Sequence, residues 1–142
     1  MKIILAYTFK NFPYTDLLPF KSIREFKKLN NDIKDFCKEI IEYKPELIIG
    51  IAKSTKDYSA IEKYTVNKFN KGVLIKNAPI KYELDIPKEF EKCIRINTKP
   101  TTSFCNLTMF KIKHFLEENN IKTSFLFIHI ANNGIENLRN MI

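Results

Sequence analysis

Three continuous apolar runs divide the chain, and each has the length of a β-strand. They cover residues 2–7, 47–52 and 125–130. Runs of this kind, without polar alternation, are typical of strands that are buried on both faces of a sheet. Between the first two runs, apolar side chains recur at helical spacing over residues 32–43. The order strand, helix, strand predicts a βαβ unit and therefore a parallel sheet.

Shorter elements are expected in the rest of the chain, separated by loops over residues 8–20 and 53–61. The expected short strands cover residues 64–67, 72–75 and 93–97, and the expected helices cover residues 85–91 and 106–118. No internal repeat or linker interrupts the pattern. We therefore predict one domain over residues 1–142, with an α/β fold. Its architecture should be a three-layer α/β/α sandwich around a mostly parallel sheet, of the phosphorylase/hydrolase-like kind.

The net charge of +8 adds little to this picture. A nucleic-acid interface needs Lys and Arg gathered on one surface with aromatic residues or Gly. Here only three residues are Arg, and the lysines are scattered, usually beside Glu or Asp. Nucleic acid is therefore not an expected partner. No apolar run reaches the roughly 18–20 residues that cross a bilayer, and the first run is too short for a signal peptide. We expect a cytoplasmic protein that does not bind membranes.

The cysteine and histidine pattern argues against a disulfide framework and a structural zinc site. The three cysteines are Cys37, Cys93 and Cys105, an odd number, and no pair has Cys-x-x-Cys spacing. The two histidines lie far apart in the sequence. We expect no metal ion and no organic cofactor.

Two residues lie at or just past the carboxyl ends of expected strands, which is where open parallel sheets usually carry their functional residues. Cys105 follows the expected strand at 93–97, directly before the helix at 106–118, where the helix dipole favours a thiolate. His129 lies near the carboxyl end of the last expected strand, inside an otherwise apolar run. A helix joins the two strands, so the strands could be neighbours and the two residues a nucleophile pair. The same positions also suit a buried thiol and a core histidine, and position alone does not choose.

Four segments, taken in order, resemble pyroglutamyl peptidase type I. Residues 96–110 resemble its nucleophile region, in which Ser-x-Ser-Ala-Gly-Thr-aromatic-x-Cys-Asn leads into a helix that carries Met and an aromatic residue. The run Phe127-Ile128-His129-Ile130 is similar to the Phe-Ile-His-Val around the family histidine, at a similar distance. Residues 62–67 are similar to Glu-Arg-x-Ala-x-Asn, which carries the family glutamate. Residues 9–12 resemble the Phe-Glu-Pro-Phe loop that covers the pyroglutamyl ring.

The resemblance implies a cysteine peptidase that removes N-terminal pyroglutamyl groups from small peptides. It implies that Cys105 is the nucleophile, His129 the general base and Glu62 the residue that orients the imidazole. The backbone N–H of Cys105 would hold the oxyanion. It further implies assembly into a dimer or tetramer. The substrate-binding residues that it implies are Phe9, Phe12, Phe104, Lys71 and Val73.

The chain departs from the family pattern in its loops, which leaves two alternatives open. Residues 97–101 replace Ser-x-Ser-Ala-Gly before the cysteine, and residues 53–56 replace a Gly-Gly-Arg stretch before the glutamate. The chain is also much shorter. One alternative is a relative without peptidase activity that binds a ligand or partner. The other is a thiol amidase that acts on a different acyl group.

Overall fold

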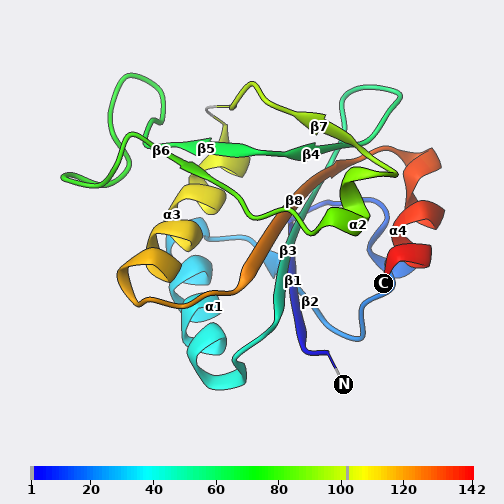
Figure 1. Cartoon of the computed structure of the whole chain (residues 1–142), viewed down its shortest axis with the longest axis horizontal. Coiled ribbons are helices and arrows are strands. Elements are labelled where there is room, and N and C mark those ends of the chain that lie inside the picture. Colours follow the sequence, from blue (N-terminus) through cyan, green and yellow to red (C-terminus); the bar gives the residue numbers. More distant parts are fainter. Residues whose placement is uncertain (1, 102) are drawn as a thin grey trace.

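The centre of the protein is a six-stranded sheet, seen nearly edge-on in Figure 1. The computed structural model describes residues 2–101 and 103–142. The strand order is β2-β1-β3-β8-β4-β7. Neighbouring strands are parallel except β4 and β8, which are antiparallel. The predicted mostly parallel sheet is therefore confirmed. The strands are β1 (Ile4–Phe9), β2 (Ile23–Phe26), β3 (Leu47–Lys53), β4 (Ala60–Glu62), β7 (Arg95–Asn97) and β8 (Ser124–Ile130).

Helices cover both faces of the sheet and complete the predicted three layers. Helices α1 (Leu29–Tyr43) and α3 (Phe104–Glu118) lie on one face, and α2 (Lys88–Glu91) and α4 (Ile135–Met141) lie on the other (Figure 1). A separate antiparallel pair, β5 (Tyr64–Val66) and β6 (Lys81–Glu83), contacts α3. Short 3₁₀ turns cover Thr15–Leu17 (η1) and Asn132–Gly134 (η2). Within the described residues, no helix has the length and hydrophobicity needed to cross a membrane.

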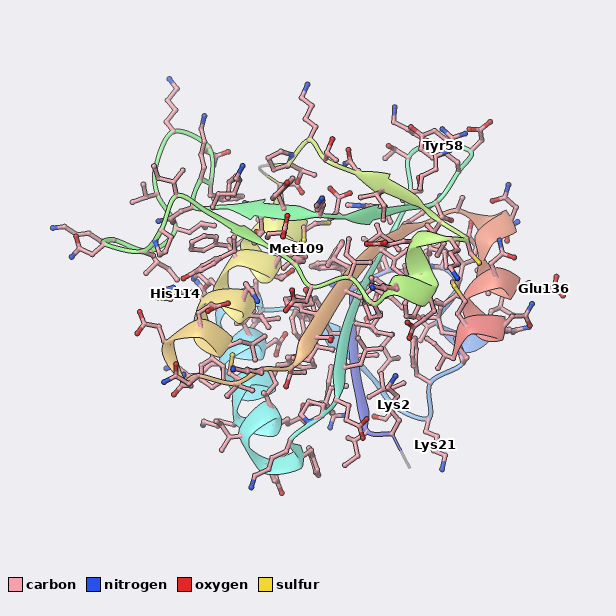
Figure 2. All side chains as sticks on the ribbon, viewed as in Figure 1. Lys2, Lys21, Tyr58, Met109, His114 and Glu136 are labelled. Atoms are coloured by element: carbon pink, nitrogen blue, oxygen red, sulfur yellow. The ribbon has the colours of Figure 1, made fainter. Side chains whose placement is uncertain are left out.

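Strand β8 shows why the central strands have continuous apolar runs in the sequence. Phe125 and Phe127 enter the core under α1 and α3, whereas Leu126 and Ile128 enter the core under α2 and α4. Both faces of the strand are thus buried, as predicted. Figure 2 shows side chains filling the space between the sheet and both helical layers. Gly50 on β3 is required here, because a Cβ would lie 2.5 Å from the Phe127 ring.

Helix α1 follows its predicted stripe but begins earlier. Ile33, Phe36 and Ile40 are buried as expected, whereas Ile41 is exposed. The helix begins at Leu29 because the carboxylate of Asp32 accepts the backbone N–H groups of the two residues before it. It ends where Lys44 adopts a left-handed conformation, with φ 47°, ahead of Pro45.

Four sequence expectations are wrong. Residues 72–75 are not a strand; a single bridge joins Phe69 to Gly72, and β6 is the partner of β5. Strand β4 lies partly inside the loop expected at 53–61, because three residues are too few to show a period. The strand expected at 93–97 begins only at Arg95, and β7 is not the neighbour of β8. Strand β4 lies between them, antiparallel to β8.

Candidate active site

Three polar side chains form a row across β8, β4 and β7. Ala60 lies opposite His129 in the antiparallel pair, and Glu62 lies opposite Asn97 in the parallel pair. Side chains alternate between the two faces of a strand, so Glu62 is on the same face as Ala60 and diagonal to His129. Pairing alone therefore places the imidazole, the carboxylate and the amide on one face. This is the face that α3 covers.

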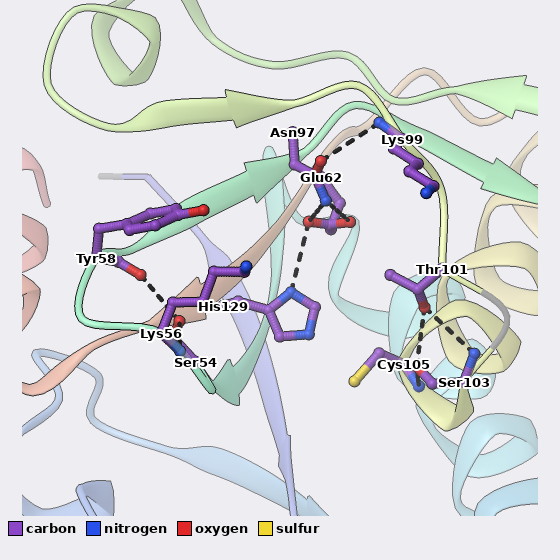
Figure 3. Close-up of polar contacts among 10 residues, drawn as sticks. All are labelled: Ser54, Lys56, Tyr58, Glu62, Asn97, Lys99, Thr101, Ser103, Cys105 and His129. Atoms are coloured by element: carbon purple, nitrogen blue, oxygen red, sulfur yellow. Dashed lines mark hydrogen bonds and ion pairs between the residues drawn. The ribbon is translucent and has the colours of Figure 1, made fainter.

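The carboxylate of Glu62 is the centre of this row. Its side chain is almost completely buried, and a buried carboxylate needs partners. The Nδ2 of Asn97 donates to both of its oxygens, at 2.9 and 3.0 Å. The Nδ1 of His129 lies 3.5 Å from Oε2, which is an ion-pair distance rather than a short hydrogen bond (Figure 3). The carboxylate thus fixes the imidazole by one nitrogen and leaves Nε2 free to face other groups.

Cys105 enters the site from the first turn of α3. The helix begins at Phe104, one residue before the cysteine rather than after it as expected. Ser103 is the N-cap, and its Oγ accepts the backbone N–H of Cys105 at 3.2 Å. The hydroxyl of Thr101 is 2.9 Å from that of Ser103 (Figure 3). The N–H expected to hold an oxyanion is therefore occupied by the cap in this conformation.

Asn106 fastens the start of α3 to β5 and the residues that follow it. Its side chain is completely buried. The Oδ1 accepts the Thr65 hydroxyl at 2.7 Å and the Val66 N–H at 2.9 Å. The Nδ2 donates to the carbonyls of Val66 and Lys68, at 2.9 and 3.1 Å. All four hydrogen-bonding positions of the amide are satisfied, so the residue holds the helix start in one place.

A second polar chain supports the helix from β1. Thr108 donates to the carbonyl of Cys105 at 2.8 Å. The hydroxyl of the buried Tyr7 then donates to Thr108 Oγ1 at 2.9 Å. The ring of Tyr7 stacks on Phe26, with ring centroids 4.4 Å apart. The backbone of the cysteine is therefore connected to the aromatic core.

The thiol of Cys105 and the imidazole of His129 face each other. Figure 3 shows Sγ directed toward the ring, on the side away from Glu62. Burial lowers the pKa of His129, but the polar contacts of the ring with Cys105 and Glu62, together with the charges of those groups, outweigh burial and raise that pKa to about 9. Between these two described side chains no hydrogen bond has full thiol–imidazole geometry. Proton transfer between them therefore needs the two side chains to align.

A pocket of about 440 Å³ opens beside His129. The same strand face forms its floor, and the loop between β3 and β4 forms its wall. The lining includes Lys56, Tyr58 and Arg95 as well as the polar row, but not Cys105. A larger pocket, of about 670 Å³, is lined by α1, α3 and residues 74–76 and contains none of these residues.

The residues expected to bind substrate occupy several places. Phe9 packs in the core under α1 and α3, with its ring centroid 6.4 Å from that of Phe127, which lies 5.3 Å from the His129 ring. Phe12 packs against the core on the opposite face of the sheet. Phe104 is 58% exposed and contacts Phe69, 5.3 Å between ring centroids.

Lys71 and Val73 are exposed at the turn around the bridge of Phe69 and Gly72. In the structure, only the Phe127 ring separates Phe9 from the imidazole of His129. The five residues do not line one common pocket. Their part in substrate binding stays a prediction.

Two parts of the site were not identified from the sequence. Asn97 was noted only as part of an altered loop, although the alternation at residues 93–97 already placed it with Arg95 on one face. Its partnership with Glu62 depends on β4, which the pattern did not reveal. Asn106 was noted only as part of the Cys-Asn match, and its anchoring role depends on contacts 40 and 41 residues away in sequence.

Comparison with known proteins identifies the fold. No family model matches the chain, and no curated protein sequence matches it. Solved structures do match. Pyrrolidone carboxyl peptidase from Thermococcus litoralis superposes with a TM-score of 0.71 at 19% identity, covering 92% of this chain and 77% of that one. Pyroglutamyl peptidase I from Bacillus amyloliquefaciens gives a TM-score of 0.71 at 14% identity, covering 92% and 82%.

The enzyme from Pyrococcus furiosus gives a TM-score of 0.69 at 18% identity, covering 90% and 80%. The resemblance read from four short segments is therefore confirmed at the level of the fold. The chain has the α/β fold of the pyroglutamyl peptidase I structures.

Proposed function

We propose that the protein is a cysteine peptidase that removes N-terminal pyroglutamyl groups from peptides. One observation carries the proposal: a helix-borne thiol faces a strand-borne imidazole whose other nitrogen contacts a buried carboxylate. This is the order of groups in a nucleophile, base and orienting-acid triad. The fold and the four sequence matches support the pyroglutamyl specificity.

Acylation begins with attack of the Cys105 sulfur, whose proton His129 Nε2 has taken, on the carbonyl carbon of the pyroglutamyl group. The C–S bond forms as the carbonyl π electrons move to oxygen. The C–N bond to the next residue then breaks, and His129 Nε2 gives a proton to the leaving amine. Glu62 stabilises the imidazolium at Nδ1 before this transfer.

Deacylation reverses the roles of the imidazole. The neutral ring takes a proton from water, and the resulting hydroxide attacks the thioester carbonyl. The C–S bond breaks, pyroglutamic acid leaves, and the thiolate and imidazolium are restored.

The raised pKa of His129, about 9, bears on how the cycle starts. At neutral pH the imidazole of the resting enzyme is already protonated. A protonated ring at this position can stabilise the attacking sulfur and can later act as the acid. The helix N-terminus adds a favourable field at the sulfur.

Oxyanion binding requires one rearrangement. The backbone N–H of Cys105 lies at the helix start, where it can stabilise developing negative charge. It currently donates to Ser103 Oγ. The substrate oxyanion would have to displace this hydroxyl, and the charged acceptor makes the stronger hydrogen bond.

The direct test is hydrolysis of a fluorogenic pyroglutamyl amide by the purified protein. We expect turnover that falls by at least about 10⁴-fold in Cys105→Ala and by about 10³-fold or more in His129→Gln. Circular dichroism of both variants should match that of the parent chain. Absence of turnover, or turnover that survives Cys105→Ala, would contradict the proposal.

Alkylation supplies an internal control, because the chain carries three free cysteines. Iodoacetamide at neutral pH should modify Cys105 faster than Cys93, although Cys93 is the more exposed. Cys37 is buried, which raises its pKa to about 11, so it should be spared. Equal rates at Cys93 and Cys105 would indicate that the thiol is not activated.

One observation favours a second candidate, a protein that keeps the fold for binding without catalysis. The Cys105 N–H is capped, and the thiol and imidazole are not aligned. If the fluorogenic amide is bound by the parent chain and not cleaved, the binding role holds. A panel of other acyl amides distinguishes an amidase of different specificity.

A further inference from the structure

We infer that the pocket beside His129 receives the part of the substrate that leaves, and that it selects leaving peptides with an acidic residue directly after the pyroglutamyl group. This inference rests on the proposed function and adds a substrate class to it. It is carried by the position of the pocket and by the charges that line it.

The pocket lies on the leaving-group side because of which catalytic residue lines it. His129 lines it and Cys105 does not. The acyl group becomes bonded to sulfur, whereas the imidazole gives its proton to the departing nitrogen. The wall of this cavity that Tyr58 and Lys56 form lies across the imidazole from the thiol, on the side of the departing nitrogen, whereas Thr101 lines the cavity on the side of the α3 cap. Figure 3 shows Tyr58 and Lys56 on one side of the His129 ring and Cys105 on the other.

The charge lining this pocket is positive. Lys56 and Arg95 contribute two cations, and Glu62 contributes one carboxylate. Among the described lining residues no other side chain is acidic, and the Glu62 carboxylate is already engaged by Asn97 and His129. Among the ion pairs of the described residues, neither Lys56 nor Arg95 has a carboxylate partner. A carboxylate entering the pocket would supply one.

Of the two cations, Arg95 has a close aromatic contact before any ligand arrives. The guanidinium of Arg95 stacks on the Tyr58 ring, 3.9 Å from its centroid, and Lys56 Nζ lies 6.0 Å from the same centroid. Stacking engages the face of the guanidinium and leaves its N–H edge for a carboxylate. Figure 2 shows Tyr58 on the loop between β3 and β4.

That loop is itself fastened at both ends. Ser54 Oγ donates to the carbonyl of Tyr58 at 2.9 Å, and Ser59 Oγ accepts the Ala131 N–H at 2.8 Å. A preformed site of this kind loses less entropy on binding.

The test compares three peptides that differ in one side chain. Pyroglutamyl-Glu, pyroglutamyl-Gln and pyroglutamyl-Lys, each with an amidated C-terminus, are hydrolysed at low salt, and a neutral pyroglutamyl arylamide reports the peptidase activity itself. We expect kcat/KM to be about threefold to tenfold higher for the Glu peptide than for the Gln peptide, as for a partly exposed charge pair. The Lys peptide should be poorest. The ratio of Glu to Gln should approach one in high salt.

Charge variants assign the preference to the pocket. Lys56→Gln and Arg95→Gln should each lower the Glu/Gln ratio, and the double variant Lys56→Glu with Arg95→Glu should favour the Lys peptide. Lys122→Gln, an equal charge change at an exposed position outside the pocket, should leave the ratio unchanged. A ratio of one in the parent chain, or a preference that survives in the double variant, overturns the inference.

A binding arm separates this inference from the proposed function. If the neutral arylamide is not cleaved, the peptidase proposal fails, and the three peptides are then titrated into Cys105→Ala by calorimetry. Tighter binding of the Glu peptide, lost in the double charge variant, supports the acidic preference without catalysis. Equal binding of all three peptides refutes it.

Discussion

The two halves of the candidate site are built in different ways. We call His129, Glu62 and Asn97 the strand half, because β8, β4 and β7 carry them. We call Ser103, Cys105 and Asn106 the helix half, because they form the beginning of α3. Strand register fixes the first half, with each residue opposite or diagonal to the next. Polar side-chain contacts fix the second half, and the cysteine is correctly placed only while they hold.

This difference indicates which substitutions the candidate site should tolerate. Register tolerates changes of side chain outside the row, and the strand half keeps its geometry with β4 and β7 only three residues long. The helix half follows an altered loop, yet Asn106 still joins it to β5 through completely buried hydrogen bonds. We therefore expect substitutions in the strand half to change chemistry and substitutions in the helix half to change position.

Outside the thiol and imidazole themselves, the largest effect should come from Glu62→Gln in the strand half. The amide keeps the size of the carboxylate but removes the charge that stabilises the imidazolium, so kcat should fall by about 10³-fold. The pKa of His129, now about 9, should fall toward its ordinary value. Both are measurable, by hydrolysis of the pyroglutamyl amide and by NMR titration of the ring. An unchanged titration would show that the carboxylate does not act on the imidazole.

The matched change in the helix half is Asn106→Ala. It removes the acceptor of the Val66 N–H and the donor to the Lys68 carbonyl. The Thr65 hydroxyl and the Val66 carbonyl keep one partner each, the backbone carbonyl of residue 106 and the N–H of Lys68. We expect a loss of about 3 kcal/mol in the free energy of unfolding, measured with urea.

Asn119→Ala, at the exposed end of the same helix, serves as the control and should cost well under half as much. Activity of Asn106→Ala should also fall, with a pKa of His129 that moves because the thiol has moved. A variant as stable as the parent chain would refute the anchoring role.

The third experiment tests whether the Cys105 thiol in the helix half affects the protonation of His129 in the strand half. Burial opposes the charge on His129, but Cys105 and Glu62 outweigh it and raise the pKa from 6.5 to about 9. A group whose pKa is raised on folding stabilises the protein fully below its unfolded pKa, and this stabilisation is lost as pH rises through the folded pKa.

The stability of the parent chain relative to His129→Gln should therefore be greatest below about pH 6.5 and should decline between pH 6.5 and about 9. The change should be on the order of 2 kcal/mol. Adding Cys105→Ala to both chains should shrink the pH-dependent part. If it stays the same size, the thiol and the imidazole are independent.

The sequence predicted the parts of the fold that have long apolar patterns. Strands β1, β3 and β8 bury both faces, and α1 has a regular stripe, so each could be identified from periodicity. Strands β2 and β4 could not, because they are short and contribute few buried residues. Missing β4 also gave the wrong neighbour for β8.

The site was predicted from two different signals. Cys105 and His129 stand at element ends that position alone could single out, whereas Glu62 came only from the resemblance to the peptidase family. Asn97 and the cations Lys56 and Arg95 were missed. Asn97 contacts Glu62 only because of the register between β4 and β7, and Lys56 reaches the pocket only because of the conformation of the loop between β3 and β4. Local patterns do not contain such long-range information.

The smallest effect, at Ser103, separates position from chemistry within the helix half. Its hydroxyl caps α3 by accepting the Cys105 N–H, so Ser103→Ala should lower the free energy of unfolding by about 1 kcal/mol. The same change frees that N–H for an oxyanion, so kcat for the pyroglutamyl amide should stay within about threefold of the parent value or rise. Ser103→Asp restores a capping acceptor but places a negative charge beside the thiolate and the oxyanion. It should therefore be more stable than Ser103→Ala and slower. If Ser103→Ala is instead the slower of the two, the hydroxyl itself serves the reaction, and the N–H of Cys105 is not the oxyanion donor.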